Sequence, residues 1–240
     1  MTLAVMMGAW LSVCTPPAMS APAVIVGEAR GADDNVVYCE WYTDRDEQQH
    51  QQVIYADTGG EVIARKSLTF EPSLATPQFE QVNVITGEKR EARFDAVTGR
   101  WQLSYRAHQQ ASLQMASIPR DEISVIDAGF VGAVQLHWAS LQAGEKVTVE
   151  FGSTVFQKAL ALRVKRVSPG QCSLALGSGE QCIWVEAGNF LVRLFVARLE
   201  LAFDRSKQLT QFKGVVNIQT AQGETQSLHI RYHYFSPDGH

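Results

Sequence analysis

The first 27 residues of this chain lack charged side chains entirely, although 19% of the whole sequence is charged. Within them, Leu3–Cys14 is apolar apart from Ser12, which is about the length of the hydrophobic region of a secretory signal peptide. Ala18-Met19-Ser20 then places small residues where signal peptidase requires them. We therefore predict a signal peptide over residues 1–20, a single mature domain over residues 21–240, and a periplasmic location.

One element of a signal peptide is missing, because no Lys or Arg precedes the apolar stretch. The alternative interpretation is a buried strand or helix at the N-terminus. Leu11-Ser12-Val13-Cys14 also resembles a lipobox, with Val13 where a small residue is expected. Lipidation of Cys14 is therefore a further alternative.

The sequence has no basic excess and no long apolar run. The net charge is −4 and the pI is about 5.9, and Lys and Arg occur in nothing larger than short pairs. We therefore expect no nucleic-acid partner, since binding to a polyanion depends on clustered cations. No apolar segment reaches the roughly 18 residues that a membrane-spanning helix needs, so we expect no transmembrane helix in the mature chain.

Motifs for catalysis or metal binding are also missing. The chain contains no G-x-S-x-G, no H-E-x-x-H, no C-x-x-C and no Gly-rich phosphate loop. His229 and His233 fall on one face of a predicted strand, but they would lie ~13 Å apart, too far to share a metal. We expect no enzyme activity, no metal and no cofactor. A hydrolase assembled from distant residues, with His108, His137 or His229 beside a carboxylate, stays open.

The four cysteines give a mixed signal. Cys172 and Cys182 flank a turn over residues 176–180, and two alternative turn centres either place them opposite each other or do not. A disulfide between them and two free thiols are therefore both open. Cys39 lies inside an apolar strand, which favours a buried free thiol.

The pattern along the chain predicts a mainly β protein. About a dozen strands follow one another, and most are joined by short turns that contain glycine. Short turns favour antiparallel pairing of neighbours, and this strand number favours a curled sheet, a half-barrel or an open barrel.

One segment departs from the strand pattern. Residues 123–151 predict a strand, a helix and a second strand, with Asp127 as the helix N-cap and Gly144 at its C-terminal end. We expect the apolar stripe of this helix to cover the concave face of the sheet and to contact a ligand. The stripe consists of Phe130, Val134, Trp138 and Leu141.

A second apolar segment, 189–195, predicts a short helical turn on the same face. Its candidate ligand-binding residues are Phe190, Leu191, Leu194 and Phe195. The alternative to ligand binding for both apolar sets is ordinary core packing. Glu40 and Glu150 lie within predicted strands and are candidates to face the interior.

The chain resembles an uncharacterised family of bacterial secreted proteins. The residues that carry this resemblance are Asp127-Ala128-Gly129-Phe130, Trp138, Gly144-Glu145, Ile63-Ala64-Arg65-Lys66 before Leu68 and Phe70, and Leu199-Glu200-Leu201 before Phe203-Asp204. In the order of its elements it is also similar to periplasmic carriers of the LolA/LolB lipoprotein-localisation type. Those are curled half-barrels whose apolar concave face is closed by helices. This resemblance implies an architecture and assigns no binding residue.

Two functional hypotheses follow. The first is a periplasmic binding or carrier protein for an apolar, lipid-like ligand. The second is an interaction or assembly module of the cell envelope that has an envelope protein as partner and no small-molecule ligand.

Overall fold

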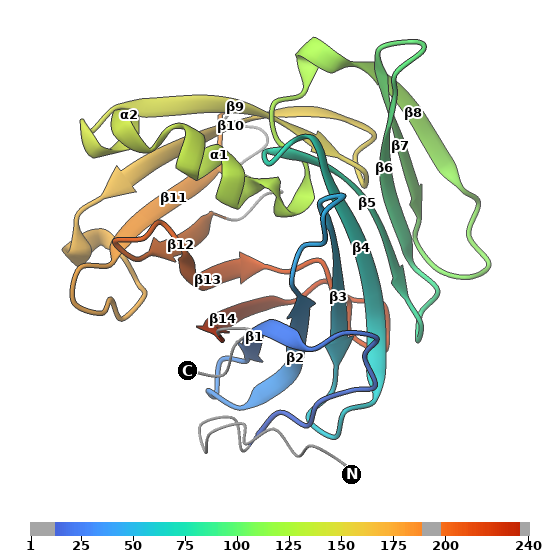
Figure 1. The fold of residues 1–240 in the computed structure, drawn as a ribbon, viewed down its shortest axis with the longest axis horizontal. Helices are drawn as coiled ribbons and strands as arrows, with labels where there is room; N and C mark the ends of the chain where they lie inside the picture. The colour runs from blue at the N-terminus through green and yellow to red at the C-terminus, as the bar shows by residue number, and fades with distance from the viewer. Residues whose placement is uncertain (1–12, 189–197, 236–240) are drawn as a thin grey trace.

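The structure is a computed structural model that describes residues 13–188 and 198–235. Within these ranges the chain forms fourteen strands and two short α-helices (Figure 1). The strands are β1 (Ala23–Arg30), β2 (Val36–Thr43), β3 (His50–Ala56), β4 (Val62–Ser73), β5 (Thr76–Asn83), β6 (Lys89–Asp95), β7 (Arg100–Arg106), β8 (Gln114–Pro119), β9 (Lys146–Ser153), β10 (Lys158–Val167), β11 (Gln181–Ala187), β12 (Leu199–Phe203), β13 (Leu209–Val215) and β14 (Ser227–Tyr234). The helices are α1 (Phe130–Leu136) and α2 (Trp138–Gln142), with 3-10 turns η1 (Arg120–Glu122), η2 (Asp127–Gly129) and η3 (Pro169–Gln171).

All fourteen strands belong to one antiparallel sheet. Its order is β8-β7-β6-β5-β4-β3-β2-β1-β14-β13-β12-β11-β10-β9, so each half of the chain is a meander. The two meanders meet where β1 pairs with β14, for example Gly27 opposite Tyr232. The predicted curled antiparallel sheet is thereby confirmed. The short turns cause this arrangement, because a strand that reverses within a few residues pairs with its predecessor.

The sheet curls but its ladder does not close. β8 and β9 are the two edges and no ladder joins them. The chain that leaves β8 instead crosses to β9, where Val125 forms a single parallel bridge with Phe151. At this corner Ala159 of β10 packs against the core cluster that holds Trp101 and Ile118. The two ends of the sheet therefore meet through side chains.

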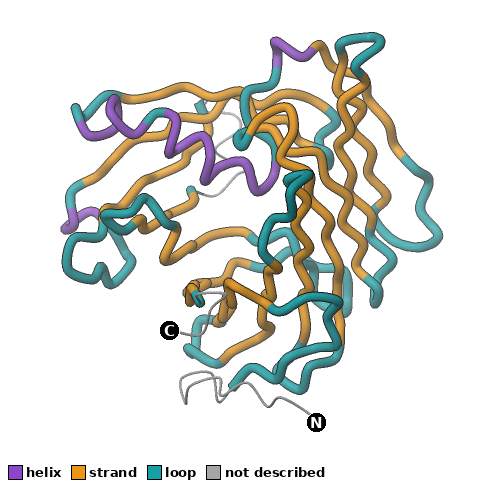
Figure 2. The backbone as a smooth tube through the Cα atoms, in the orientation of Figure 1, coloured by secondary structure: helices purple, strands orange, loops and turns teal. Residues whose placement is uncertain are grey.

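The helix pair, α1 and α2, lies inside the curl (Figure 1). Figure 2 shows the pair passing from the tip of the β4–β5 hairpin towards β9–β12. The predicted helix is confirmed in position but is interrupted at His137. Gly144 follows α2 with a φ of +83°, as predicted for the residue after a helix end. No described helix combines the length and the apolar character that crossing a bilayer requires.

Two glycines bring the helix pair into contact with the sheet. A Cβ atom on Gly129 would lie 1.9 Å from the backbone oxygen of Ala75, and one on Gly132 would lie 2.5 Å from that of Leu74. Both partners belong to the β4–β5 turn. Backbone therefore packs directly on backbone here, which only glycine allows.

The helix pair divides the concave core into two clusters. One cluster packs Val134 and Leu141 of the helices on β9–β12, and the other fills the curl of β1–β8 and β14. Phe212 of β13 packs against both clusters. The two clusters thus meet at Phe212 of β13.

The N-terminal residues cover part of the convex face. Cys14 forms a disulfide with Cys39, and Thr15 donates a backbone hydrogen bond to Thr58. Cys14 and Met19 pack in one cluster with Trp41, which is 1% exposed. In the full chain Cys39 is therefore not a free thiol. For a chain cleaved after Ser20, which lacks Cys14, a free Cys39 stays a prediction. Cys172 and Cys182 also form a disulfide, and this resolves the open alternative for that pair.

Candidate functional site

A row of residues across four strands places a buried carboxylate on the concave face. In register, Tyr232 of β14 lies opposite Gly27 of β1, Gly27 opposite Glu40 of β2, and Glu40 opposite Tyr55 of β3. A Cβ atom on Gly27 would lie 3.0 Å from the ring of Tyr232. Glycine therefore leaves room for the Tyr232 ring to lie over β1 beside Glu40.

Tyrosine hydroxyls satisfy the Glu40 carboxylate, which is 3% exposed. Tyr42 donates a hydrogen bond to Oε2 at 2.5 Å, and Tyr38 donates to Oε1 at 3.3 Å. Burial raises the pKa of Glu40, while the hydrogen bond from Tyr42 and the positive charge of Lys66 oppose that rise. Burial also raises the pKa of Tyr42 and Tyr232 well above the usual value, so both keep their protons.

A buried ion pair joins the helix segment to the sheet beside Glu40. Lys66 Nζ of β4 lies 2.5 Å from Asp127 Oδ1, and the side chains are 3% and 12% exposed. Asn217 Nδ2 and the backbone N–H of Ala128 also donate to Asp127. The predicted N-cap role of Asp127 is wrong, because Ile126 occupies the cap position and no side chain caps η2. The carboxylate points to Lys66 instead.

Apolar side chains on the same face remain half-buried, and we call them the half-buried set. They come from the helix pair and from strands of both halves of the sheet. The half-buried set consists of Phe130, Trp138, Phe151, Leu199, Phe212, Tyr42 and Tyr232. Phe130 stacks on Phe151 with ring centroids 5.2 Å apart, and Tyr42 meets Tyr232 edge to face at 6.2 Å. Apolar and aromatic side chains of this kind commonly line ligand-binding sites.

The predicted ligand-binding residues of the helix divide into two groups. Phe130 and Trp138 belong to the half-buried set, whereas Val134 and Leu141 are completely buried against β9–β12. The other four candidates, Phe190, Leu191, Leu194 and Phe195, lie outside the described residues together with their predicted helical turn. Their role in binding stays a prediction.

Strand alternation determines which face of the sheet each of the two candidate carboxylates takes. Glu40 faces the interior, as predicted. Glu150 does not, because its neighbours Val149 and Phe151 pack in the core under the helix pair and Glu150 takes the other face of β9. The tyrosines around Glu40 were not predicted, although the alternation of Tyr38, Glu40 and Tyr42 is visible in the sequence.

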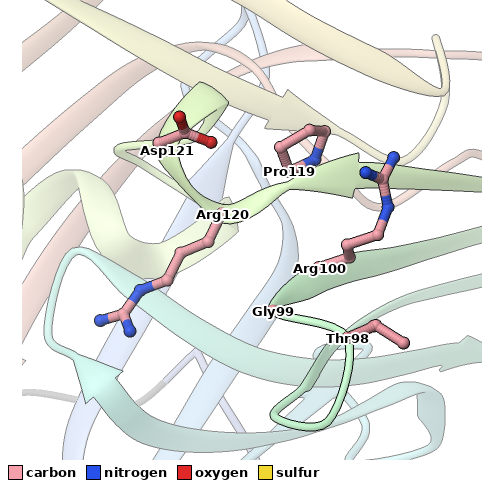
Figure 3. Close-up of a pocket in the computed structure, with 6 residues that line it drawn as sticks. All are labelled: Thr98, Gly99, Arg100, Pro119, Arg120 and Asp121. Carbon is pink, nitrogen blue, oxygen red and sulfur yellow. The ribbon is translucent and has the colours of Figure 1, made fainter.

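Two surface pockets lie elsewhere. One of about 430 Å³ is lined by the β6–β7 turn and the end of β8, where the side chains of Arg100 and Arg120 point in different directions (Figure 3). A second of about 330 Å³ lies between β8 and the start of β10. Neither is lined by a predicted site residue.

The histidines named for a dispersed hydrolase site do not meet carboxylates. His229 Nε2 lies 3.0 Å from Gln211 Oε1, and His108 Nδ1 lies 3.4 Å from Gln110 Oε1. Within residues 13–188 and 198–235, none of His108, His137 and His229 forms an ion pair with an acidic side chain. The geometry therefore offers this hypothesis no support.

Comparison with known proteins shows weak structural similarity and no sequence match. No protein-family model matches the chain, and no curated protein matches it in sequence. Among solved structures, the chain is similar to a β-barrel-like protein of domain of unknown function DUF1849 from Brucella abortus. The TM-score is 0.44 at 8% identity, covering 88% of this chain and 85% of that one. The similarity to LolA/LolB-type carriers stays a prediction.

Proposed function

We propose that this protein is a periplasmic binding or carrier protein for an apolar, lipid-like ligand. The ligand lies on the concave face against the half-buried set, with Phe130 and Trp138 on one side and Phe212 on the other. Val134 and Leu141 hold the helix pair on β9–β12 by packing in the core. No catalytic step is part of the proposal.

The observation that carries the proposal is the position of Phe212. It packs against both core clusters and stays only partly buried, so part of its ring is free for a further apolar contact. Covering apolar surface is favourable by about 25 cal/mol per Å², and an aromatic side chain offers 150–250 Å² in total. Half-covered aromatic residues at this position therefore provide a driving force for a ligand.

The test is recovery of lipid with the purified protein. We expect native mass spectrometry and lipid extraction to find an apolar ligand on the wild-type protein. Phe212→Ser should lose most of it, while Val215→Ser, at a residue 42% exposed on the same strand, should keep it. Lipid-free protein that also fails to take up an alkyl probe would overturn the proposal. Thermal unfolding of both variants separates loss of binding from loss of folding.

A second candidate is the envelope interaction module, which one observation favours. β8 is an edge of the sheet, and Met115 on it and Leu113 before it are 66% and 52% exposed. A free edge with apolar side chains can pair with a strand of another protein. A pull-down that recovers one envelope protein with the wild type, and loses it with Met115→Lys, would support this candidate.

A further inference from the structure

The concave polar cluster holds two carboxylates and one lysine, so it carries one negative charge in excess. Glu40, Lys66 and Asp127 are the charged groups on this part of the face, and Lys66 is bound to Asp127. Glu40 receives hydrogen bonds from tyrosines but has no cationic group within 4.0 Å among the described residues. Removing a carboxylate from water without a counter-ion is costly, so the cluster favours a positive charge brought from outside.

Four tyrosine rings surround this carboxylate in two edge-to-face pairs. Tyr38 and Tyr55 have centroids 6.1 Å apart, and Tyr42 and Tyr232 have centroids 6.2 Å apart. The first pair is fully buried, whereas Tyr42 and Tyr232 belong to the half-buried set. Ring faces attract cations, most strongly where water is excluded. The Glu40 carboxylate and the tyrosine rings thus both favour a cationic group.

We infer that the ligand is an amphiphile whose polar end is an ammonium group, held by Glu40 and the faces of Tyr42 and Tyr232. This inference rests on the proposed function, since the alkyl part of the ligand lies on the half-buried set. Tyr232 joins the two parts, because it belongs to the half-buried set and lies over Gly27 beside Glu40. An anionic head group would meet the charge of Glu40 and be repelled.

Three probes of equal chain length test the head group. Decyltrimethylammonium, decanol and decyl sulfate, each below its micelle concentration, are titrated into delipidated protein at pH 8 and followed by calorimetry. We expect the ammonium probe to bind at least tenfold more tightly than decanol, and decyl sulfate to bind more weakly than decanol. Equal affinity for all three, or preference for the sulfate, would overturn the inference.

The same series separates this inference from the proposed function. If decanol binds and the ammonium probe binds no better, the head-group inference fails and the apolar site stands. If no probe binds, the proposed function fails and the inference fails with it. Glu40→Gln should reduce the preference for ammonium to about twofold or less and leave decanol affinity unchanged. Tyr42→Phe keeps the ring face, so this variant should retain the preference for the ammonium probe. A variant that lost binding through misfolding would lose that preference.

Discussion

Lys66 and Asp127 form a nearly buried ion pair that fixes the start of the helix pair to the middle of β4. The φ of Asp127 is +42°, a left-handed conformation that Asp and Asn tolerate better than other residues with a side chain. Asp127→Asn should therefore keep the backbone conformation while removing the charge.

Breaking this pair should destabilise the fold. Lys66→Met or Asp127→Asn alone leaves one buried charge without a partner, so we expect each to lower the free energy of unfolding by about 3 kcal/mol. The double variant should lose less than the sum of the two. Urea unfolding of the wild type, the two single variants and the double variant measures these free energies. Strictly additive losses would show that the pair is not coupled.

The contact between Gly129 and Ala75 predicts a second effect. Gly129→Ala places a methyl group 1.9 Å from a backbone oxygen, and the helix pair must move to accommodate it. We expect a loss of about 3 kcal/mol in the free energy of unfolding. Gly170→Ala is the matched control, because a Cβ atom there meets nothing within 4 Å and its effect should stay within about 0.5 kcal/mol. Similar values for both variants would contradict backbone docking at Gly129.

The Cys14–Cys39 disulfide predicts a third effect. Its cysteines are 25 residues apart, and closing a loop of this length stabilises a fold by about 3.5 kcal/mol. Cys14→Ser should therefore lower the free energy of unfolding by about that amount. A chain cleaved after Ser20 would lack this disulfide, and a chain lipidated at Cys14 could not form it. Mass spectrometry of the non-reduced mature protein distinguishes the three forms, and a free thiol on Cys39 would contradict the disulfide.

Glu40 predicts a dependence of stability on pH. Because burial raises the pKa of Glu40, the folded protein holds this proton more tightly than the unfolded chain does. Stability should therefore fall as pH rises from about 4.5, the ordinary value, through the raised pKa of Glu40, by about 1.4 kcal/mol for each unit of the rise. Glu40→Gln removes this loss. Unfolding of both proteins at pH 5 and pH 8 tests it. Burial also raises the pKa of Glu88. Glu88 is present in both the wild type and Glu40→Gln, so its contribution cancels in the difference between their stabilities. A difference between the two that does not change with pH would contradict the prediction.

The fold was predictable because its signals are local. Glycine turns and two-residue alternation identify strands and their neighbours, and Gly144 marks the end of the helix pair. The pairing of β1 with β14 was not predictable in this way, since no local signal links residues some 200 positions apart. The Cys14–Cys39 disulfide was missed for a related reason. The predicted cleavage after Ser20 removed Cys14 from consideration, and whether that cleavage occurs stays a prediction.

The candidate site was less predictable than the fold. Alternation in β2 was sufficient to predict that Glu40 could face the interior. It could not show that Tyr55 and Tyr232 converge on Glu40, because their positions depend on the register of three ladders. Asp127 illustrates a different limit. An acidic residue before an apolar stripe is typical of an N-cap, but a lysine 61 positions earlier provides a stronger partner.

The pairing of β1 with β14 has a consequence for how this molecule forms. The strand that starts the sheet obtains its second neighbour only when the strand that ends it has been made, so the middle of the sheet is the last part that can be completed. Contacts this distant in sequence are associated with slow folding and with a long exposure of unpaired edges. A ribosome-bound fragment that ends before Ser227 should therefore remain incompletely folded, with the aromatic cluster around Glu40 open to solvent.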